Sequence, residues 1–205
     1  MSDTKLKILT EISKKIGSPL TEDKKQKFLK YEEILKKWGE KVSLISKRNL
    51  DEIEKHFIDS IFLLPLIEGN ELADIGTGAG FPGIPVKIMI PEIILHLIER
   101  NRKKCIFLKN LVRELGLEKV IIYQKDWSNC FLSVDIAFAK AIGDVGNLFQ
   151  EIHHIVKPNG KFILYSSTNE PEIGEPEIFS FYNPLRNSKN YLFVYRIGNG
   201  FQSTP

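Results

Sequence analysis

The residues best suited to chemistry lie in a glycine-rich stretch, Asp74-Ile-Gly76-Thr77-Gly78-Ala-Gly80-Phe81, which follows a short apolar run. Glycines without a Cβ atom let the backbone turn sharply and let a flat ligand approach it closely. In open α/β sheets, ligands bind beyond the carboxyl ends of the strands, where this loop would lie. A plain connection between strand and helix is the alternative, but three alternating glycines behind Asp74 favour a ligand site.

The spacing of these glycines distinguishes two kinds of ligand. The dinucleotide motif is G-x-G-x-x-G, and counted from Gly76 its third glycine would fall on Phe81. S-adenosylmethionine has no pyrophosphate but carries an amine and a sulfonium, and the Asp74 carboxylate beside the loop suits those cations. We therefore predict S-adenosylmethionine as the cofactor, with a nicotinamide dinucleotide as the alternative.

Three more residues could complete this cofactor site. Glu99 ends a second apolar run about 20 residues after the loop, where an acidic side chain can accept both ribose hydroxyls. A surface glutamate paired with Arg100 is the alternative interpretation of Glu99. Asp126 follows a third apolar run and could accept from the adenine amino group, while Trp127 could cover the ring face.

The first seventy residues are predicted to be helical. Thr21 is expected to cap a helix whose apolar stripe recurs every three to four residues, at Phe28, Tyr31, Leu35 and Trp38. A third helix is expected to begin at Asp51, with Glu54 as the capping partner and an end near Pro65. Its expected buried face is formed by Ile53, Phe57, Ile61 and Leu64.

From residue 71 the pattern changes to strands alternating with helices. Strands are expected at 72–75, 93–98, 120–123, 134–139 and 162–165, with helices near 101–115 and 144–156. Such alternation predicts an α/β fold, a mostly parallel sheet with helices on both faces. After a loop at 168–177, strands at 178–182 and 191–195 predict an antiparallel C-terminal hairpin. We expect an N-terminal helical extension (1–69) packed with a core (70–205) as a single domain.

Bulk composition excludes several classes of protein. The 205 residues carry a net charge of +3, too small to decide on nucleic-acid binding, and no apolar run reaches membrane-spanning length. Two cysteines, Cys105 and Cys130, exclude a disulfide framework and are expected to be buried packing residues. Adjacent His153 and His154 would point in different directions on a helix. We expect a cytoplasmic monomer without membrane or metal partners.

Four segments resemble the RsmG (GidB) family of bacterial methyltransferases. The most specific is Asp74-Ile-Gly-Thr-Gly-Ala-Gly-Phe-Pro-Gly-Ile-Pro85; the others are Trp38-Gly-Glu-Lys-Val-Ser-Leu44, His56-Phe-Ile-Asp59-Ser60 and Lys103-Lys-Cys-Ile-Phe-Leu108. The resemblance implies a Rossmann-like class I methyltransferase that acts on N7 of a guanine in small-subunit ribosomal RNA. It also implies that Gly76 and Phe81 contact the cofactor, that Glu99 takes the ribose, and that Lys140 lies near the methyl-transfer site.

The chain departs from the family pattern at three places. Ala139-Lys140-Ala141 stands where the family has S-R-A, Ser166-Ser167 replaces a Lys-Gly pair, and Ser43 replaces an asparagine. Lysine keeps the charge of arginine but loses the guanidinium fork. These departures leave open the alternative of a divergent protein that binds S-adenosylmethionine with little or no turnover.

The predicted reaction needs few catalytic groups. Guanine N7 has an in-plane lone pair and no proton, so attack on the sulfonium methyl requires alignment and a dry pocket rather than a general base. Lys140 is the candidate for an electrostatic or positioning role, with a solvated lysine at a strand end as the alternative. For the RNA we expect contacts from residues that the motifs and the basic helix supply: His56, Asp59, Ser60, Arg100, Arg102, Lys103 and Lys104.

Overall fold

A computed structural model of the protein describes residues 1–39, 44 and 52–198. The helices in these ranges are α1 (Asp3–Lys15), α2 (Glu22–Gly39), α4 (Ile53–Ile61), α5 (Gly83–Met89), α6 (Arg102–Glu114) and α7 (Val145–Glu151). Short 3-10 turns are η1 (Leu64–Leu66), η2 (Trp127–Asn129) and η3 (Ile152–His154). The strands are β1 (Glu71–Ile75), β2 (Ile94–Ile98), β3 (Val120–Tyr123), β4 (Val134–Ala139), β5 (Val156–Ser166), β6 (Glu177–Asn183) and β7 (Ser188–Arg196).

The described strands form one seven-stranded sheet in the order β3-β2-β1-β4-β5-β7-β6. The pairs among β1 to β5 are parallel, whereas β7 runs antiparallel to both β5 and β6. This confirms the predicted α/β fold and its antiparallel hairpin. The chain leaves β1 toward β2 and β3 on one side and returns to β4 on the other. Ligands of open α/β sheets bind at this switch in strand order, beyond the strand ends.

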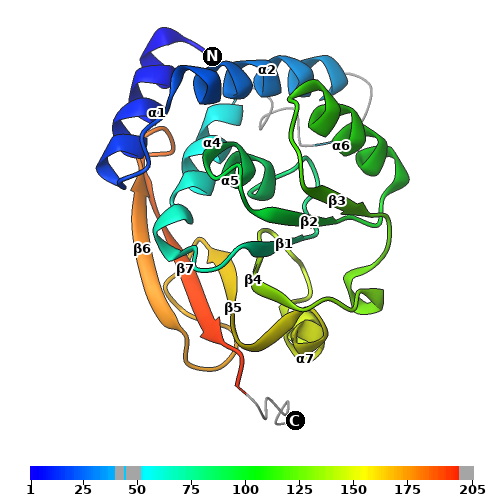
Figure 1. The fold of residues 1–205 in the computed structure, drawn as a ribbon. Helices are drawn as coiled ribbons and strands as arrows, with labels where there is room; N and C mark the ends of the chain where they lie inside the picture. Colours follow the sequence, from blue (N-terminus) through cyan, green and yellow to red (C-terminus); the bar gives the residue numbers. More distant parts are fainter. Residues whose placement is uncertain (40–43, 45–51, 199–205) are drawn as a thin grey trace.

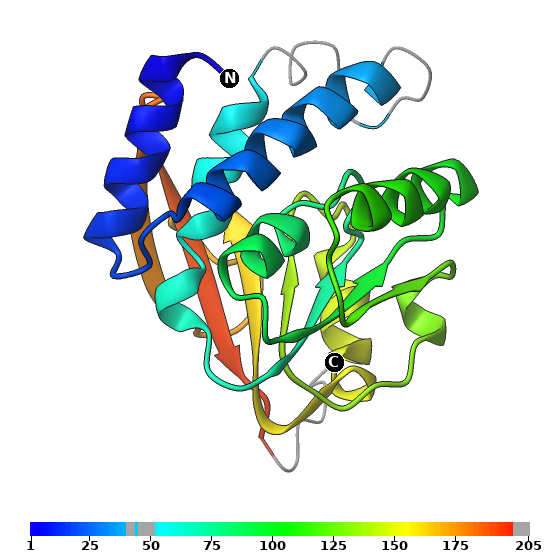
Figure 2. The ribbon, with the colours of Figure 1, turned by 45° about the horizontal axis from the view of Figure 1, so that its top comes forward.

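Helices cover both faces of the sheet. Figures 1 and 2 show α2, α4, α5 and α6 on one side of the sheet and α7 on the other. Successive residues of a strand point to opposite faces, and accordingly Leu72 joins the core under α2, α4, α5 and α6 while Ala73 joins the core beside α7. Phe138 and Ala137 of the neighbouring strand divide in the same way. The strands are therefore held between two packed layers, and this fixes the position of the loops that leave their ends.

The N-terminal helices share a core with the sheet. As predicted, the α2 stripe is buried: Phe28, Tyr31 and Leu35 are all 0 % exposed. Phe28 packs edge-on against Phe57 of α4, with ring centroids 4.9 Å apart. The hydroxyl of Thr21 accepts a 3.4 Å hydrogen bond from the amide of Lys24, which confirms the predicted cap. The extension is therefore packed on the helix that follows the glycine loop, rather than standing apart from it.

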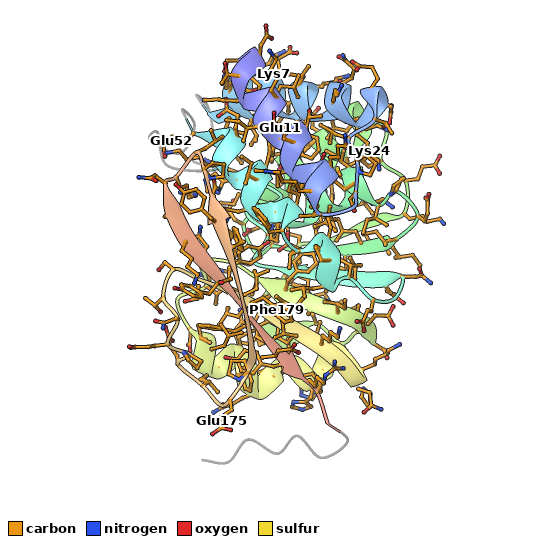
Figure 3. The ribbon with its side chains drawn as sticks, turned by 90° about the vertical axis from the view of Figure 1, so that its left-hand side faces the viewer. Lys7, Glu11, Lys24, Glu52, Glu175 and Phe179 are labelled. Atoms are coloured by element: carbon orange, nitrogen blue, oxygen red, sulfur yellow. The ribbon has the colours of Figure 1, made fainter. Side chains whose placement is uncertain are left out.

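The C-terminal hairpin closes one edge of the sheet. β7 inserts between β5 and β6, and Figure 3 looks onto this edge, with Phe179 on the hairpin and Glu175 just before β6 begins. Phe181 stacks on Phe62 at 4.3 Å between ring centroids. At the turn of the hairpin, the side-chain amide of Asn183 donates to the carbonyl of Lys55 in α4 at 2.9 Å. The turn is thereby fixed against an N-terminal helix.

Two boundaries differ from the sequence prediction. The predicted start of the third helix, Asp51, lies outside the described residues; the N-cap of α4 is Glu52, and Glu54 pairs with Lys5 at 2.9 Å instead of acting in a capping box. The helix predicted for 144–156 ends at Glu151, and β5 already begins at Val156. The Lys157-Pro-Asn-Gly160 segment is typical of a turn, but an irregularity in the pairing with β4 and a φ of 65° at Asn159 accommodate it within the strand.

Candidate active site

A cleft of about 750 Å³ lies beyond the carboxyl ends of β1, β2 and β4. Pockets for small ligands and cofactors have volumes of roughly 300–1,000 Å³. Four of the predicted cofactor residues line it: Gly76, Glu99, Asp126 and Trp127. Two residues predicted to contact RNA, Arg100 and Lys104, also line it, together with the loop after β4 at Ala141, Ile142, Gly143 and Asp144.

A Cβ atom at either of the first two glycines of the loop would meet other protein atoms only at ordinary contact distances, and the nearest is Ile142, at 3.4 Å from the Gly76 position. Gly76 and Gly78 have φ angles of 66° and 59°, a conformation that side chains other than glycine rarely adopt. A Cβ atom on Gly78 would meet nothing closer than the Gly76 carbonyl at 3.8 Å and the Lys104 ammonium at 3.9 Å. The Gly76 amide donates to the Ile98 carbonyl at 2.9 Å, which fixes the loop to the end of β2. A ligand can therefore approach the bare backbone here.

The third glycine serves packing instead of ligand approach. A Cβ atom on Gly80 would lie 2.7 Å from the Tyr31 hydroxyl and 2.8 Å from Ile84, so protein atoms already fill that space. The same tyrosine, which is fully buried, donates to the Ala79 carbonyl at 2.6 Å. Phe81 stacks on the Tyr31 ring with the centroids 5.4 Å apart, is 8 % exposed, and is not among the residues that line the cleft. Its contact with the cofactor stays a prediction.

Glu99 organises the cleft from the end of β2. Its carboxylate accepts from the amide of Gly78 at 3.1 Å and from the amide of Asn101 at 2.7 Å. An ionised carboxylate offers about four lone-pair positions, so these two bonds leave capacity for hydroxyl donors. Asp126 makes weaker contacts. Its carboxylate accepts from the Ser128 amide at the start of η2, and its distance to the Arg100 guanidinium is 3.5 Å. Both carboxylates thus remain candidates for a nucleoside.

Asp74 lies beneath the loop and not in the cleft wall. The residue is 0 % exposed, and one carboxylate oxygen accepts from the Thr77 hydroxyl at 2.7 Å and from the Gly83 amide at 2.8 Å. The other oxygen is buried with no hydrogen-bond partner among the described residues. Burial raises the pKa of Asp74 to about 7, against the lowering effect of these two donors. A nearby cation would favour the ionised form.

A cluster of polar and charged side chains adjoins the cleft. We call it the Asp59 cluster and define it as His56, Asp59, Lys140, Asn183 and Arg186. One oxygen of Asp59 accepts from the Lys140 ammonium at 2.8 Å and from Nε of Arg186 at 3.2 Å. The other accepts from the side-chain amide of Asn183 at 2.7 Å. Nδ1 of His56 lies 3.4 Å from the Lys140 ammonium and 3.3 Å from Nη2 of Arg186. Three separate segments of the chain, α4, the end of β4 and the turn of the C-terminal hairpin, thus meet at one carboxylate.

The environment sets the protonation of this cluster. Burial opposes the ionisation of Asp59, but Lys140, Asn183 and Arg186 outweigh it and hold its pKa below the ordinary value. Burial and the two neighbouring cations lower the pKa of His56 to about 3, so the ring is neutral near pH 7. Burial lowers the pKa of Lys140, while Asp59 works in the opposite direction. Lys140 is therefore a partly buried, paired group and not a solvated lysine at a strand end.

The remaining predicted RNA residues are dispersed. Ser60 is 0 % exposed, and its hydroxyl donates to the His56 carbonyl at 2.6 Å within α4. Arg102 and Lys103 are exposed in the first turn of α6, and the side chain of Arg100 is 81 % exposed. The structure thus brings His56 and Asp59 to Lys140, whereas the Ser60 hydroxyl bonds to the backbone of α4. Arg100, Arg102 and Lys103 lie at the start of α6. Their contacts with RNA stay predictions.

Sequence reasoning missed Arg186, Asn183 and Tyr165. The Tyr165 hydroxyl donates to the Asp59 carbonyl at 3.0 Å, and the Lys140 ammonium lies 5.2 Å from the Tyr165 ring centroid. Arg186 and Asn183 lie in the turn of the C-terminal hairpin, more than 120 residues from Asp59 in the sequence. An isolated arginine in a predicted turn carries no local signal of such a role.

Within residues 1–39, 44 and 52–198, no group of three or more histidine, cysteine, aspartate or glutamate side chains is arranged to hold a metal ion. No helix within the same ranges has the length and apolarity needed to cross a bilayer.

The fold is that of the Rossmann-like methyltransferases. An RNA methyltransferase from Salinibacter ruber, solved with S-adenosyl-L-homocysteine, superposes with a TM-score of 0.53 and 14 % identity, over 78 % of this chain and 97 % of that one. At this identity the likeness concerns the fold alone.

Sequence comparison places the chain more closely. The family model for rRNA small subunit methyltransferase G (GidB) matches residues 24–183. The methyltransferase G of Clostridium kluyveri is 34 % identical over 179 residues, which cover 82 % of this chain and 76 % of that protein. That of Desulfitobacterium hafniense is 47 % identical over 107 residues, 52 % of this chain and 45 % of that protein. The chain belongs to the rRNA small subunit methyltransferase G family.

Proposed function

We propose that the protein transfers a methyl group from S-adenosylmethionine to N7 of a guanine in small-subunit ribosomal RNA. The observation that carries the proposal is the cleft at the switch in strand order, where Gly76, Glu99 and Asp126 meet in a chain of this family. Ala141 lines the cleft directly after Lys140, so the cleft adjoins the Asp59 cluster. One site for a nucleoside and one for a charged substrate thus lie next to each other.

The residues of the cleft fit the proposed cofactor. When bound, S-adenosylmethionine supplies an electrophilic methyl group on a sulfonium. Glu99 has acceptor capacity for the ribose hydroxyls, and Asp126 with Trp127 offers an acceptor and an aromatic face for the adenine. The buried oxygen of Asp74 without a donor lies behind the glycine loop, and a cationic ligand there would favour the ionised form of this carboxylate.

The proposed acceptor atom needs no general base. Guanine N7 presents a lone pair and loses no proton, so the protein has to align the base and exclude water. The Asp59 cluster is built of groups that pair with one another, and its only histidine is neutral with a pKa of about 3. These groups suit holding the substrate better than moving a proton.

We also propose that the protein works as a monomer, without a metal ion, in the cytoplasm where ribosomal subunits are assembled. Sedimentation of the active protein and activity after treatment with EDTA test the first two statements. An active dimer or a loss of activity on chelation would contradict them.

Transfer of tritium from labelled S-adenosylmethionine tests the main proposal. The protein is incubated with small subunits, or their RNA, from cells that lack this modification, and labelled nucleotides are mapped. We expect label on one guanine. The label should persist when groups other than N7 on that guanine are replaced, and it should be lost when N7 is replaced by carbon. Absence of label in every assembly state, alongside binding of S-adenosylhomocysteine measured by calorimetry, would identify a cofactor-binding protein without turnover and refute the proposal.

A further inference from the structure

The Asp59 cluster has more hydrogen-bond donors than it uses. Arginine carries five N–H groups and a lysine ammonium three. The contacts to Asp59 and His56 engage two N–H groups of Arg186 and two of Lys140 at most, which leaves about four for another acceptor. The side chains of Lys140 and Arg186 are 18 % and 25 % exposed, so part of each is open to a ligand.

The histidine of the cluster contributes an acceptor for the two cations. Because the ring of His56 is neutral and its Nδ1 faces two cationic donors, the ring proton resides on Nε2. Nε2 is buried and has no hydrogen-bond partner among the described residues. The atom that the ring turns to Lys140 and Arg186 is therefore the acceptor Nδ1, which helps to hold the two cations side by side.

The direct contacts of the cluster sum to one positive charge, from two cations, one carboxylate and a neutral ring. The nearest other carboxylates do not reverse this sum within the cluster. Glu52 is paired with Lys55 at 2.7 Å, and Asp74 has a pKa of about 7 and makes its contacts inside the glycine loop. The Asp59 carboxylate, whose side chain is 4 % exposed, is occupied by Lys140, Arg186 and Asn183.

Such a site does not suit the guanine base itself. The N1 and N2 positions of guanine are donors and need acceptors, which the cluster does not offer. The N7 and O6 positions are acceptors, but a donor on N7 would occupy the lone pair that has to react. Methylation also places positive charge on the base, which adjacent cations would oppose. Phosphate oxygens, by contrast, accept several N–H groups and match the planar arginine fork.

We propose that Lys140 and Arg186 form a subsite for a backbone phosphate that flanks the guanine being methylated, with His56, Asp59 and Asn183 as positioning residues that hold the two cations together. The subsite adjoins the cofactor cleft through Ala141, next to Lys140 in the chain. This inference rests on the proposed function, since it names the part of the RNA substrate that the cluster takes.

Equilibrium binding of RNA tests the subsite independently of turnover. The affinity of an RNA fragment with the target guanine is measured in the presence of S-adenosylhomocysteine at several salt concentrations. We expect Arg186→Gln to weaken RNA binding by about tenfold and to reduce the slope of log affinity against log salt by about 0.7, the value for one phosphate contact on a single strand. The affinity for S-adenosylhomocysteine stays unchanged. Arg186→Lys, which retains the charge, keeps most of the slope.

Arg196→Gln is the matched control, because Arg196 is an exposed arginine at the opposite end of β7. It removes the same charge without touching the cluster, and we expect a smaller change in slope and affinity. An equal effect of both substitutions would reduce the role of Arg186 to general charge and overturn the proposal. Thermal unfolding shows that each variant is folded; Arg186→Gln leaves Asp59 paired with Lys140.

A single neutral phosphate distinguishes a phosphate subsite from a base contact. RNAs with one methylphosphonate at successive positions around the guanine are compared on the wild-type protein and on Arg186→Gln. We expect one position at which neutralisation weakens wild-type binding but adds little to the variant, the signature of a coupled pair. Additive losses at every position would overturn the proposal. Methylation by the wild type with unaltered RNA binding by Arg186→Gln would refute this inference alone, whereas RNA binding without methylation would refute the proposed function alone.

Discussion

Tyr31→Phe tests whether the N-terminal helices hold the glycine loop in place. The substitution removes one oxygen atom from a fully buried ring and with it the 2.6 Å hydrogen bond to the Ala79 carbonyl. The ring can keep its contacts with Phe57 and Phe81, because these involve the aromatic face and edge. The change therefore isolates the hydrogen bond from the packing.

The expected magnitude follows from the burial of the carbonyl. A buried polar group that loses its partner costs about 1–3 kcal/mol. For a chain of this length, each kcal/mol lowers the melting temperature by roughly 2–4 °C, so we expect a decrease of roughly 2–12 °C. If the loop relaxes in the ligand-free variant, binding of the cofactor has to restore the conformation of the loop. We therefore expect the Kd for S-adenosylhomocysteine to rise up to about tenfold.

Calorimetry and thermal unfolding measure the two effects. The matched control is Tyr182→Phe, which removes a hydroxyl bonded to Asn187 from a tyrosine that is 54 % exposed on β6. Surface changes of this kind usually stay within about 0.5 kcal/mol. If Tyr31→Phe unfolded at the temperature of the control and bound S-adenosylhomocysteine as tightly as the wild type, the hydrogen bond would have no role in positioning the loop.

Three further predictions concern the cleft. Gly78→Val should abolish binding of S-adenosylhomocysteine in calorimetry, because a branched side chain is strained at a φ of 59° and enters the cleft; wild-type affinity would mean that the ligand lies elsewhere. Glu99→Gln should weaken the same binding by about tenfold, since one charge-assisted acceptor for the loop amide and the ribose is lost, and an unchanged Kd would contradict that role. With a pKa of about 7, Asp74 is partly protonated in the free protein, and a bound cation favours its ionised form. The sulfur of S-adenosylhomocysteine is uncharged, so this compound serves as the reference. The ratio of the affinity for S-adenosylmethionine to that for S-adenosylhomocysteine should therefore rise as the pH increases through about 7. Asp74→Asn should flatten this pH profile.

The position of the cleft could be predicted because three of the residues that line it come shortly after strand ends. Gly76, Glu99 and Asp126 each come just after an apolar run, and the carboxyl ends of parallel strands meet at one edge of a sheet. Position along the chain then predicts position in space. The role of Gly80 was not accessible in this way, because the tyrosine that fills its space comes from α2, in a separate part of the sequence.

The Asp59 cluster was predicted only in part, for a related reason. The resemblance indicated His56, Asp59 and Lys140, but Arg186 and Asn183 reach them only because β7 inserts between β5 and β6. Local patterns of apolar residues predict that two strands form a hairpin but not which of them joins the sheet. The early start of β5 was missed because residues typical of a turn occupy an irregular part of that strand.

The insertion of β7 also has a consequence for synthesis on the ribosome. The N-terminal helices, the glycine loop and the parallel strands precede residue 167 and can assemble while the chain is still being translated. Asn183 and Arg186 emerge afterwards, and the hairpin that bears them must pair with β5 before they can reach Asp59. A nascent chain would thus complete the residues that line the cleft first, and the Asp59 cluster would receive Asn183 and Arg186 last.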